Sequence, residues 1–570
     1  MSVFVADFET VNDVKDCRVW CWAFTDINCK EFRWGIYLDT FMNWVGAELP
    51  TLYFHNQKFD CDFLYYYLFE NGFSYVENEK LLSGKSFTIL MSDRGQLYTV
   101  VICFGNNYKG KKRICRIYDS LKLLPFSVAQ MAKAFGLEEG KGEIDYNKKR
   151  EIGYTPSCEE VDYIRRDVQI VAQSLSFLFL EGHNKMTIGA NALDSYKKTV
   201  GKNFKAWFPE LTMDSYLRKS YKGGFTYCKK SIQGKDIGEG VVFDVNSLYP
   251  WVMYVKALPY GEPIFFEGKY EEDEIYNLHI SRVIVDLKLK EGHLPCLQIK
   301  GNLLYDNTEY IEETVEPTEL TLTSVDLKLI QDHYEGEIIY MDGWKFKSQT
   351  GMFQEYIDGW TKVKEQATEE GNEGKRTLAK LMLNSLYGKF GVNPRVVSKH
   401  LKYEDGIAKF YEGEEETRKT LYIPIASFIT AYAREKTIRS GQEVYDRFLY
   451  ADTDSLHLTG NEIPENIEVD SKKLGCWKKE NIFSRARFLR QKCYMEFHIK
   501  EKKVESFTLR YEKKSITCSG MTQKSYPYVT WTNFHIGAVY NGHLSKSRVH
   551  GGTVLLENQF SIKEKRGLQK

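Results

Sequence analysis

The chain opens on a short alternation of apolar and polar residues. In VFVADFET, residues 3–10, Asp7 and Glu9 flank Phe8, so a β-strand would turn both carboxylates to the same face. A second aromatic run, YFHNQKFDCDFL at residues 53–64, predicts a strand that ends in polar residues before another apolar stretch begins. The two segments therefore predict strands with acids on or beside them.

Two longer segments have the apolar spacing of α-helices. In EEVDYIRRDVQIVAQSLSFLFL, residues 159–180, Tyr163 and Asp167 are four residues apart and so share one helix face. In GKRTLAKLMLNSLYGKFG, residues 374–391, leucines form an apolar side, and the helix is expected to end near Gly388. The other face of this second helix should display Arg376, Lys380, Asn384 and Tyr387.

Two aspartate motifs lie at predicted strand ends. The β-branched run in GEGVVFDVNSLYPWVM, residues 238–253, delivers Asp244 just before a turn that leads into a helix. In DRFLYADTDSLHLTG, residues 446–460, two apolar strands flank Asp452 and Asp454, which would be displayed at the tip of a hairpin. An ordinary Asp-rich turn would explain the second motif taken alone, but it does not explain both motifs.

Length and composition set the class of protein. At 570 residues and 66.5 kDa the chain exceeds the usual size of one domain, so at least two are expected. Its 43% hydrophobic and 27% charged residues are typical of a soluble globular protein, and no long apolar run predicts a membrane span. The acidic start does not resemble a signal peptide, which indicates a cytoplasmic protein. The 12 cysteines form no paired CxxC units and are expected to be reduced core thiols.

Charge is distributed unevenly along the chain. The formal net charge is zero, but residues 471–570 contain 21 Lys and Arg against 7 Asp and Glu. A basic C-terminal part on an acidic body suits a protein that binds phosphates at one end and metals with carboxylates elsewhere. A solvated basic tail is the alternative, and the aromatic residues in this part argue against it.

Two sets of acids predict metal-dependent chemistry. The first set, in the N-terminal part, consists of Asp7, Glu9, Asp60 and Asp167. If they converge, they would suit phosphodiester cleavage with two ions of Mg²⁺ or Mn²⁺, and Tyr163 could orient the attacking water. The second set consists of Asp244, Asp452 and Asp454. These three would repel one another unless cations or protons neutralise them, which predicts a second two-metal site.

The motifs DFE, NQKFD and YIRRD, in this order, resemble those of the DEDDy exonucleases that are fused to family B DNA polymerases. The resemblance implies that the first set of acids forms the metal site with Glu143, that Tyr163 is catalytic and that Lys141 assists the chemistry. It also implies that a frayed single strand is held by Thr10, Tyr53, His55, Asn56, Phe59, Phe63, Ser120, Leu121 and Tyr146. Stacking on aromatic rings is a general way to hold single strands, although the aromatic members of this group would equally suit a core.

The motifs DxxSLYP, KxxxNSLYG and YxDTDS resemble motifs A, B and C of family B DNA polymerases. The resemblance implies that Asp244, Asp454 and the carbonyl of Val245 hold the polymerising metals, that Asp452 supports them, and that Tyr249 excludes a ribose 2′-hydroxyl. The incoming nucleotide would be contacted by Lys364, Lys380, Asn384 and Tyr387. The segment EQATEEGNEGK makes the stretch ahead of motif B longer than expected, which bears on the role of Lys364.

Further motifs and two insertions narrow the family. YKGGF, TAYAR and QKCY resemble the YxGG, TxxAR and KxY motifs, and the DNA contacts they imply are Tyr221, Gly223, Gly224, Thr430, Arg434, Lys492 and Tyr494. Residues 256–353 and 391–421 resemble the two terminal-protein regions of the phi29-type polymerases of Bacillus phages. In that family Ser247 and Asp326 fall at positions tied to the use of a terminal protein.

The fold implied is mixed α/β (α+β): an RNase H-like DEDDy exonuclease domain followed by a right-hand polymerase with two terminal-protein-region insertions. The expected boundaries are 1–185 for the exonuclease, 186–255 and 422–519 for the palm, 256–353 for the first insertion, 354–390 for the fingers, 391–421 for the second insertion and 520–570 for the thumb.

The function implied is protein-primed, DNA-templated DNA synthesis on a linear viral genome, with strand displacement and 3′→5′ proofreading. Each active site would use two Mg²⁺ ions, for which Mn²⁺ substitutes. The expected partners are primer-template DNA, the displaced strand, dNTPs and a terminal protein bound as a heterodimer. The protein would otherwise be a monomer, without a membrane, in the cytoplasm of a bacterial host. The alternatives are a polymerase that uses nucleic-acid primers only, a DNA-binding exonuclease, and a replication scaffold with decayed sites.

Overall fold

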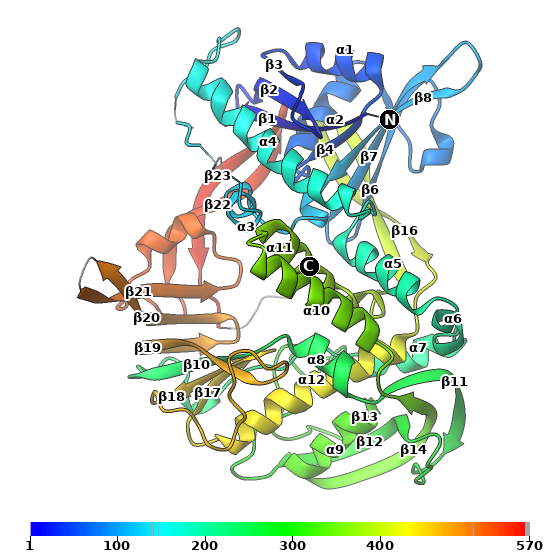
Figure 1. The fold of residues 1–570 in the computed structure, drawn as a ribbon, viewed down its shortest axis with the longest axis vertical. Coiled ribbons are helices and arrows are strands. Elements are labelled where there is room, and N and C mark those ends of the chain that lie inside the picture. The colour runs from blue at the N-terminus through cyan, green and yellow to red at the C-terminus, as the bar shows by residue number, and fades with distance from the viewer. Residues whose placement is uncertain (1, 138–139, 141, 146–147, 505–506, 565–570) are drawn as a thin grey trace.

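The computed structural model describes residues 2–137, 140, 142–145, 148–504 and 507–564 (Figure 1). An N-terminal α/β layer occupies the upper part of the view, and a second α/β layer with its own sheet lies below it. A pair of helices lies between the two layers, and a C-terminal hairpin runs from the lower layer back to the upper one. The mixed α and β structure expected from the sequence is confirmed.

The N-terminal layer is built on an eight-stranded sheet of order β3-β2-β1-β4-β8-β7-β6-β5. Strand β1 pairs antiparallel with β2 and parallel with β4, so its acids lie inside the sheet rather than at an edge. Helix α4 packs on β1 and β2. It is the long helix that the apolar spacing predicted, and it ends at Leu180. The bounds are β1 Val3–Val11, β2 Arg18–Asp26, β3 Phe32–Gly35, α1 Leu38–Glu48, β4 Thr51–Phe54, α2 Asp60–Glu70, β5 Ser74–Tyr75, β6 Lys85–Met91, β7 Leu97–Asn106, β8 Lys112–Asp119, α3 Val128–Ala134 and α4 Cys158–Leu180.

The lower layer is built on a seven-stranded sheet of order β21-β20-β19-β10-β18-β17-β9. The predicted strand ahead of Asp244 and the predicted hairpin around Asp452 and Asp454 are confirmed as neighbours in this sheet. Helix α12 is buried along most of its length and packs against the sheet together with α8. The bounds are β9 Thr226–Cys228, β10 Gly240–Val245, α8 Leu248–Val255, α12 Ile423–Glu443, β17 Phe448–Asp452, β18 Ser455–Thr459, β19 Trp477–Arg490, β20 Cys493–Val504 and β21 Phe507–Cys518.

The segment between β10 and the helix pair forms a third sheet, of order β11-β14-β12-β13. Helix α9 packs on it, and the contact encloses a core of its own. This long connection therefore has strands and a core of its own. The bounds are β11 Leu258–Glu267, β12 Leu278–Leu289, β13 Thr318–Thr323, α9 Ser324–His333 and β14 Tyr334–Gln349.

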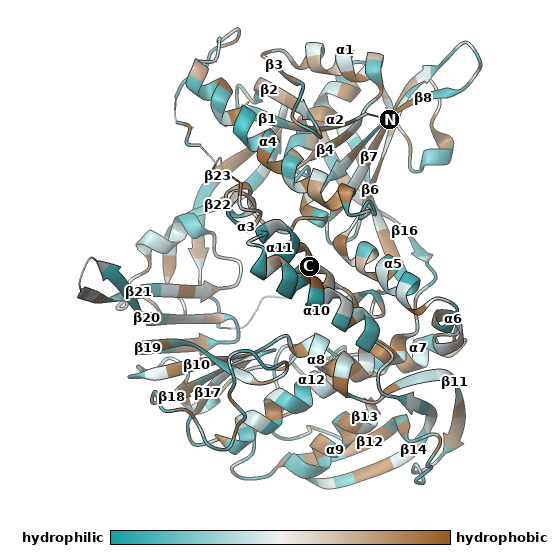
Figure 2. Ribbon diagram, viewed as in Figure 1, coloured by the Kyte–Doolittle hydropathy of each residue, from teal (hydrophilic) through white to brown (hydrophobic). Residues whose placement is uncertain are grey.

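Helices α10, Gln354–Glu369, and α11, Glu373–Ser385, form the pair between the layers. The long stretch ahead of motif B is absorbed by the end of α10 and a tight turn, and the Asn372 side chain caps α11 by accepting from the Lys375 N–H at 2.9 Å. Hydrophilic residues lie along the outer side of α11 (Figure 2). The helix ends at Ser385, so the expectation that it reaches Tyr387 is wrong; that residue lies in the following 3₁₀ turn, Tyr387–Lys389.

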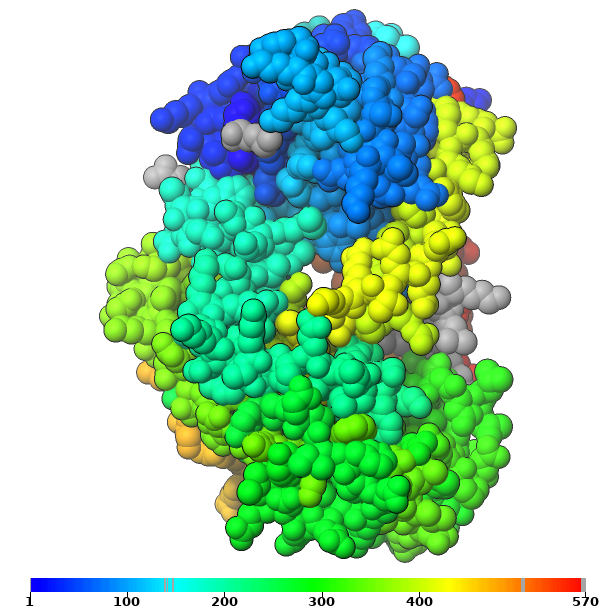
Figure 3. All heavy atoms as spheres, turned by 90° about the vertical axis from the view of Figure 1, so that its right-hand side faces the viewer, coloured from blue at the N-terminus to red at the C-terminus, as the bar shows by residue number. Residues whose placement is uncertain are grey.

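Two further β-hairpins lean on the N-terminal layer. One consists of β15, Arg395–Glu404, and β16, Ile407–Thr417, and follows the flank of this layer (Figure 3). The other, called the C-terminal hairpin below, consists of β22, Val539–Val549, and β23, Gly552–Ser561, and contacts α2 and β16. None of the described helices is long and apolar enough to cross a membrane.

The cysteines largely follow the sequence expectation. All twelve are free thiols, and nine of them are buried. Cys158, at the start of α4, is exposed, so the expectation that every cysteine lies in a core is wrong for this residue. It is exposed because the first turn of the helix projects beyond the sheet, where the Ser157 side chain caps it.

Candidate active sites

The strand ends of the lower sheet bring the second set of acids together. Asp244 lies on β10 opposite Ser455 of β18, and Asp452 ends β17 opposite the same serine. The N–H of Val245 donates to the carbonyl of Asp454 at 2.8 Å, which fixes the two strand ends against each other. The convergence predicted from two separate motifs is therefore present in the structure.

The turn between the two hairpin aspartates is tightly held. Thr453 has φ +63°, and the N–H of Asp454 donates to the carbonyl of Asp452 at 2.7 Å. The Asp452 carboxylate accepts from the Thr226 hydroxyl at 2.9 Å and lies 3.0 Å from the Lys492 ammonium. The charge of Asp452 is thus neutralised by Lys492. Within the described residues, neither Asp244 nor Asp454 forms an ion pair.

Excess negative charge marks this site. Burial, followed by the charges of Asp454 and Glu480, raises the pKa of Asp244 to about 7. Burial also raises the pKa of Asp454, with Asp452 and Glu480 adding to it. Sequence reasoning missed Glu480, because only the pairing of β10 with β19 carries it to the site. Like charges confined in this way favour the binding of a cation.

The donor set fits a hard divalent cation. Asp244 and Asp454 offer carboxylate oxygens, and the Val245 carbonyl lies at the end of the same strand as Asp244. Such a set of oxygens suits Mg²⁺, which usually takes one or two carboxylates and leaves its other positions to water and substrate phosphates. Within the described residues, no group of three or more His, Cys, Asp or Glu side chains is arranged to hold a metal ion by itself.

A cavity of about 560 Å³ opens beside these acids. Two of the residues that line it, Tyr249 and Tyr387, stack with ring centroids 4.0 Å apart and planes 22° from parallel. Burial, followed by the neighbouring Tyr387, raises the pKa of Tyr249 far above its ordinary value, so its hydroxyl stays protonated. Motifs A and B therefore meet in one aromatic wall of the cavity.

The helix pair adds cations to the other side of the site. Lys380 is exposed on α11, one turn before the exposed Asn384. The charges of Lys478 and, to a smaller extent, Lys380 partly offset the rise in the pKa of Asp244. Burial, followed by the charges of Lys380 and Arg376, lowers the pKa of Lys364 on α10. Lys364 therefore lies with the α11 cations despite the longer stretch ahead of motif B.

Two residues assigned separately from the sequence pair with each other. The Arg434 guanidinium donates to both carboxylate oxygens of Asp326, at 2.7 and 2.8 Å from Nη2, and to the carbonyls of Lys222 and Gly223 at 2.9 and 2.7 Å. Arg434 and Asp326 are 3% and 7% exposed, and Thr430 on the same helix is 2% exposed. The Arg434 side chain holds the YKGGF segment in place, and the predicted contacts of these three residues with DNA or a terminal protein stay predictions.

The YKGGF segment also supports the turn that contains Thr453. A Cβ on Gly224 would lie 2.8 Å from the side chain of Thr453, and the Thr453 N–H donates to the carbonyl of Phe225 at 2.6 Å. Tyr221 packs so closely on Gly391 that a Cβ there would lie 2.5 Å from its hydroxyl. The need for glycine at position 224 is therefore steric, whereas a Cβ on Gly223 would meet nothing within 4 Å.

The remaining predicted contacts lie at the edge of the same cavity. Lys492 has φ +52°, and its N–H donates to the hydroxyl of Tyr450 at 3.1 Å. Tyr494 packs on the same tyrosine ring, with centroids 5.0 Å apart. Ser247 also has a positive φ, of 55°, at the start of α8. The structure thus places the KxY residues next to the acids, where their role as DNA contacts stays a prediction.

A buried carboxylate beneath the cavity gives a pH-dependent prediction. Glu496 is 2% exposed and lies 2.6 Å from His457 and 2.7 Å from His498. Despite burial, these two imidazoles lower the pKa of Glu496 to about 2. Because the folded protein lowers this pKa, the ionised Glu496 contributes its full stabilisation at pH values above the pKa of Glu in the unfolded chain, ~4.3. The stabilisation is lost as the pH falls from there towards 2. Glu496→Gln should therefore lower the Tm at pH 6, and its Tm difference from the unaltered protein should narrow below pH ~4.3; a constant difference would contradict this.

The first set of acids meets in the N-terminal layer. Asp7, His55 and Asp167 line a cavity of about 140 Å³ between β1 and α4. Asp60, 4% exposed, begins α2; burial, followed by the charge of Asp7 and to a smaller extent that of Glu9, raises its pKa well above its usual value. Acids far apart in the sequence are therefore neighbours, as the motif order indicated, and their oxygens again fit a hard divalent cation.

The segment ahead of α4 completes this region only in part. Tyr163 is 3% exposed, and a Cβ on Gly142 would lie 3.2 Å from its ring. Glu143 is exposed at this point of the chain. Lys141 and Tyr146 lie outside the described residues, so their predicted roles are not placed by the structure.

The predicted strand-holding residues divide into two groups. Polar groups surround the loop after β4: His55 Nε2 donates to the carbonyl of Phe126 at 2.7 Å, and its Nδ1 lies 2.9 Å from the Ser120 hydroxyl. The N–H groups of Asn56 and Leu121 both donate to the Asp119 carboxylate at 3.0 Å. This loop is therefore rigidly held, with the exposed Asn56 in the left-handed region at φ +65°.

The aromatic members differ in exposure. Tyr53 and Phe63 are 8% and 1% exposed and belong to the cores, which matches the core alternative weighed for them. Phe59 is only half-buried and lies 5.7 Å from Phe63, centroid to centroid. Thr10 is half-buried on β1, where the register with β2 shifts. Of these aromatic residues, Phe59 is best placed to meet a ligand.

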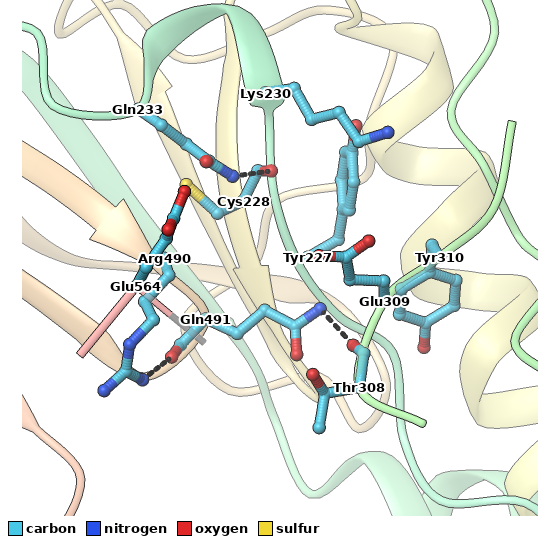
Figure 4. Close-up of a pocket in the computed structure, with 10 residues that line it drawn as sticks. All are labelled: Tyr227, Cys228, Lys230, Gln233, Thr308, Glu309, Tyr310, Arg490, Gln491 and Glu564. Atoms are coloured by element: carbon cyan, nitrogen blue, oxygen red, sulfur yellow. Dashed lines mark hydrogen bonds between the residues drawn. The ribbon is translucent and has the colours of Figure 1, made fainter. Parts of the chain in front are cut away.

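A third cavity, of about 310 Å³, lies away from both sets of acids (Figure 4). Tyr227 and Tyr310 line it, and Gln491 crosses it to donate to the carbonyl of Thr308 at 2.8 Å. Its other side chains have opposite charges, with Arg490 and Lys230 near Glu309 and Glu564. The cavity lies between the β19–β20 turn and the segment that connects β12 to β13. Its described lining residues include no cluster of like charge and no set of metal ligands.

The chain is similar to known DNA polymerases over nearly its whole length. A family model described as DNA polymerase type B, organellar and viral, matches residues 47–157 and 147–473. The chain is 46% identical to the DNA polymerase of Bacillus phage M2 and 45% identical to that of Bacillus phage phi29; each alignment covers 99% of this chain and at least 99% of the relative. It is also similar to the solved structure of Phi29 DNA polymerase complexed with primer-template DNA, with 42% identity, a TM-score of 0.93 and coverage of 99% and 100% of the two chains. The ternary complex of the same polymerase with incoming nucleotide matches with a TM-score of 0.92.

Proposed function

Because the chain belongs to the organellar and viral type B DNA polymerases and is a DNA-directed DNA polymerase of the phi29 type, we propose that Asp244, Asp452 and Asp454 form its polymerising site. The observation that supports this assignment is the meeting of motifs A and C at two strand ends, in one cavity whose opposite side is cationic. Primer-template DNA and dNTPs are the substrates of this site.

The reaction is in-line attack of a primer 3′-hydroxyl on the α-phosphate of a dNTP, with pyrophosphate as the leaving group. Asp244, Asp454 and the Val245 carbonyl would hold Mg²⁺, or Mn²⁺ in its place, which supplies positive charge to the reacting phosphate. Lys380 and Lys364 neutralise the triphosphate from the helix side. The partly buried Tyr249 ring closes the space that a ribose 2′-hydroxyl would need.

The first set of acids is proposed as a separate 3′→5′ exonuclease site that removes frayed primer ends. Asp7, Glu9, Asp60 and Asp167 are the residues that would hold two Mg²⁺ ions there, with Tyr163 orienting the water. The support is the cavity between β1 and α4 and the mutual charge repulsion of Asp7 and Asp60. Glu143 and Lys141 remain proposed helpers.

The exonuclease assignment predicts a separation of activities. Asp7→Ala combined with Glu9→Ala should lower 3′→5′ degradation of a labelled oligonucleotide by about 10³-fold, because the ions lose their ligands. Primer extension should stay within about twofold, since the polymerising acids lie in another sheet. The control is Asp39→Ala with Glu48→Ala on the exposed face of α1. Loss of both activities in the first variant alone would argue against independent sites.

We also propose that synthesis starts on a side-chain hydroxyl of a terminal protein. The support is the third sheet inserted between motifs A and B and the hairpin β15–β16, in the positions of the two terminal-protein regions. Ser247 and Asp326 are the proposed contacts. The domain boundaries given above are part of this proposal, as are strand displacement, the monomeric state outside the heterodimer and action in the cytoplasm of a bacterial host.

A direct assay tests protein priming. With a candidate terminal protein, labelled dNTP and no nucleic-acid primer, the polymerase should transfer a nucleotide to that protein, and product should be absent with Asp454→Asn. The same preparation must extend an ordinary primer, which shows that the polymerase is active. Primer extension without any nucleotide transfer to an authentic partner would leave the polymerase and remove protein priming.

A further inference from the structure

Four cations from three distant segments meet beside Phe59. Lys58 precedes this residue, Lys399 lies on β15, and Lys546 and Arg548 lie on β22 of the C-terminal hairpin. The Lys546 ammonium lies over the Phe59 ring, 5.1 Å from its centroid. The four residues Lys58, Lys399, Lys546 and Arg548 are called the basic cluster below.

Close packing brings the C-terminal hairpin to this place. A Cβ on Gly552 would lie 2.4 Å from the Phe63 ring, and a Cβ on Gly551 would lie 2.0 Å from the carbonyl of Cys17. The Asn12 side chain donates to the carbonyl of Leu555 and accepts from its N–H, at 2.9 and 2.6 Å. The hairpin is therefore seated on the exonuclease layer by its glycine turn and by the hydrogen bonds of the Asn12 side chain with the Leu555 backbone.

Strand β15 reaches the same place from the other side. Ser398 forms a β-bridge with Ser92, and Lys399 is the next residue. The turn that follows Ser92 is the one against which Lys58 rests, since a Cβ on Gly95 would lie 3.0 Å from the Lys58 ammonium. Backbone pairing therefore places Lys399 near Lys58.

The positive charge of the basic cluster is only partly compensated. Arg548 forms an ion pair with Asp62 at 3.0 Å and lies over the Phe410 ring. Among the described residues, none of the three lysines has an ion-pair partner. Lys58 is half-buried and Lys546 is exposed. Like charges held together in this way favour a polyanionic ligand.

We propose that the basic cluster binds the phosphodiester backbone of a single DNA strand on its way into the exonuclease site, with Lys546 placed over Phe59 as its central contact. This inference rests on the proposed exonuclease function. It assigns to the C-terminal hairpin and to β15 a part in holding the strand that the exonuclease layer degrades.

The chemistry of the surroundings favours a single strand. Cations next to a half-buried aromatic ring match the way proteins hold single strands, with phosphates on ammonium groups and a base on the ring. The strand is the one that enters the exonuclease site, because Phe59 is followed directly by Asp60. A template strand passing the same surface is the competing occupant.

Binding without metal separates the strand contact from cleavage. The affinity of the full-length protein for a fluorescent single-stranded oligonucleotide is measured in EDTA at several salt concentrations. Two lost phosphate contacts should reduce the slope of log K against log salt by about 1.4, so Lys58→Ala with Lys546→Ala should bind about 20-fold more weakly at ~0.1 M salt. Lys546→Arg should retain most of the affinity. The matched control is Lys524→Ala, an exposed residue that pairs with Glu557.

Cleavage and extension assays identify the occupant. The double variant should raise the KM for single-strand degradation in Mg²⁺ while primer extension stays close to that of the unaltered protein. An unchanged salt slope, or the same loss with Lys524→Ala, would overturn the proposal. A loss confined to primer-templates with a long 5′ template overhang would assign the cluster to the template and overturn it as well. If the unaltered protein binds the oligonucleotide but does not degrade it, the exonuclease function fails while the phosphate contact stands.

Discussion

Asp454→Asn is expected to lower the rate of nucleotide incorporation by about 10³-fold or more. The side chain keeps its size, but it loses the negative charge that would attract a cation into the cavity between β10 and β18. Because burial and like charge already raise the pKa of Asp454, removing that charge should not destabilise the metal-free fold. The measurement is single-nucleotide incorporation on a primed template in Mg²⁺, with the Tm determined in parallel.

The matched control is Asp446→Asn, the same exchange at an exposed position two residues before β17. It should leave incorporation and Tm unchanged. Full activity of Asp454→Asn would remove the assignment of this residue as a metal ligand. A large fall in Tm would mean that the lost activity comes from a damaged fold and not from the missing charge.

Much of this site could be predicted because its signals are local. Asp244 ends a β-branched run, and Asp452 and Asp454 lie between two apolar strands, so strand ends were the natural place for all three. The helix with Tyr163 and Asp167 was equally clear from its period. In each case the residues that define the element are the residues that place the side chain.

What could not be predicted depends on pairing between distant segments. Glu480 reaches the site only through the register of β10 with β19. Phe63 and Tyr53 were weighed evenly between core and ligand contact, and only tertiary packing shows that they are buried. The Lys546 ammonium meets Phe59 because a hairpin near the C-terminus is seated on the first layer. Periodicity gives no information about such contacts.

The pairing of Asp326 with Arg434 is of the same kind, and it leads to the second large effect. Arg434→Ala would leave a carboxylate that is 7% exposed without its partner. Removal of one member of a buried ion pair costs about 3–5 kcal/mol of unfolding free energy, which for a chain of 570 residues corresponds to a Tm lower by roughly 3–4 °C. The carbonyls of Lys222 and Gly223 also lose their donor, so the segment that supports Thr453 should loosen and polymerisation should fall.

The same two helices provide a control pair. Arg439 and Asp332 lie on α12 and α9, are 39% and 44% exposed, and are 2.9 Å apart. Arg439→Ala should cost less than about 1 kcal/mol, because water replaces the lost partner at the surface. The double exchange Arg434→Met with Asp326→Leu removes both buried charges and should recover most of the Tm, but not the activity, since the two carbonyls remain without a donor. Equal Tm shifts for Arg434→Ala and Arg439→Ala would show that burial does not set the strength of this pair.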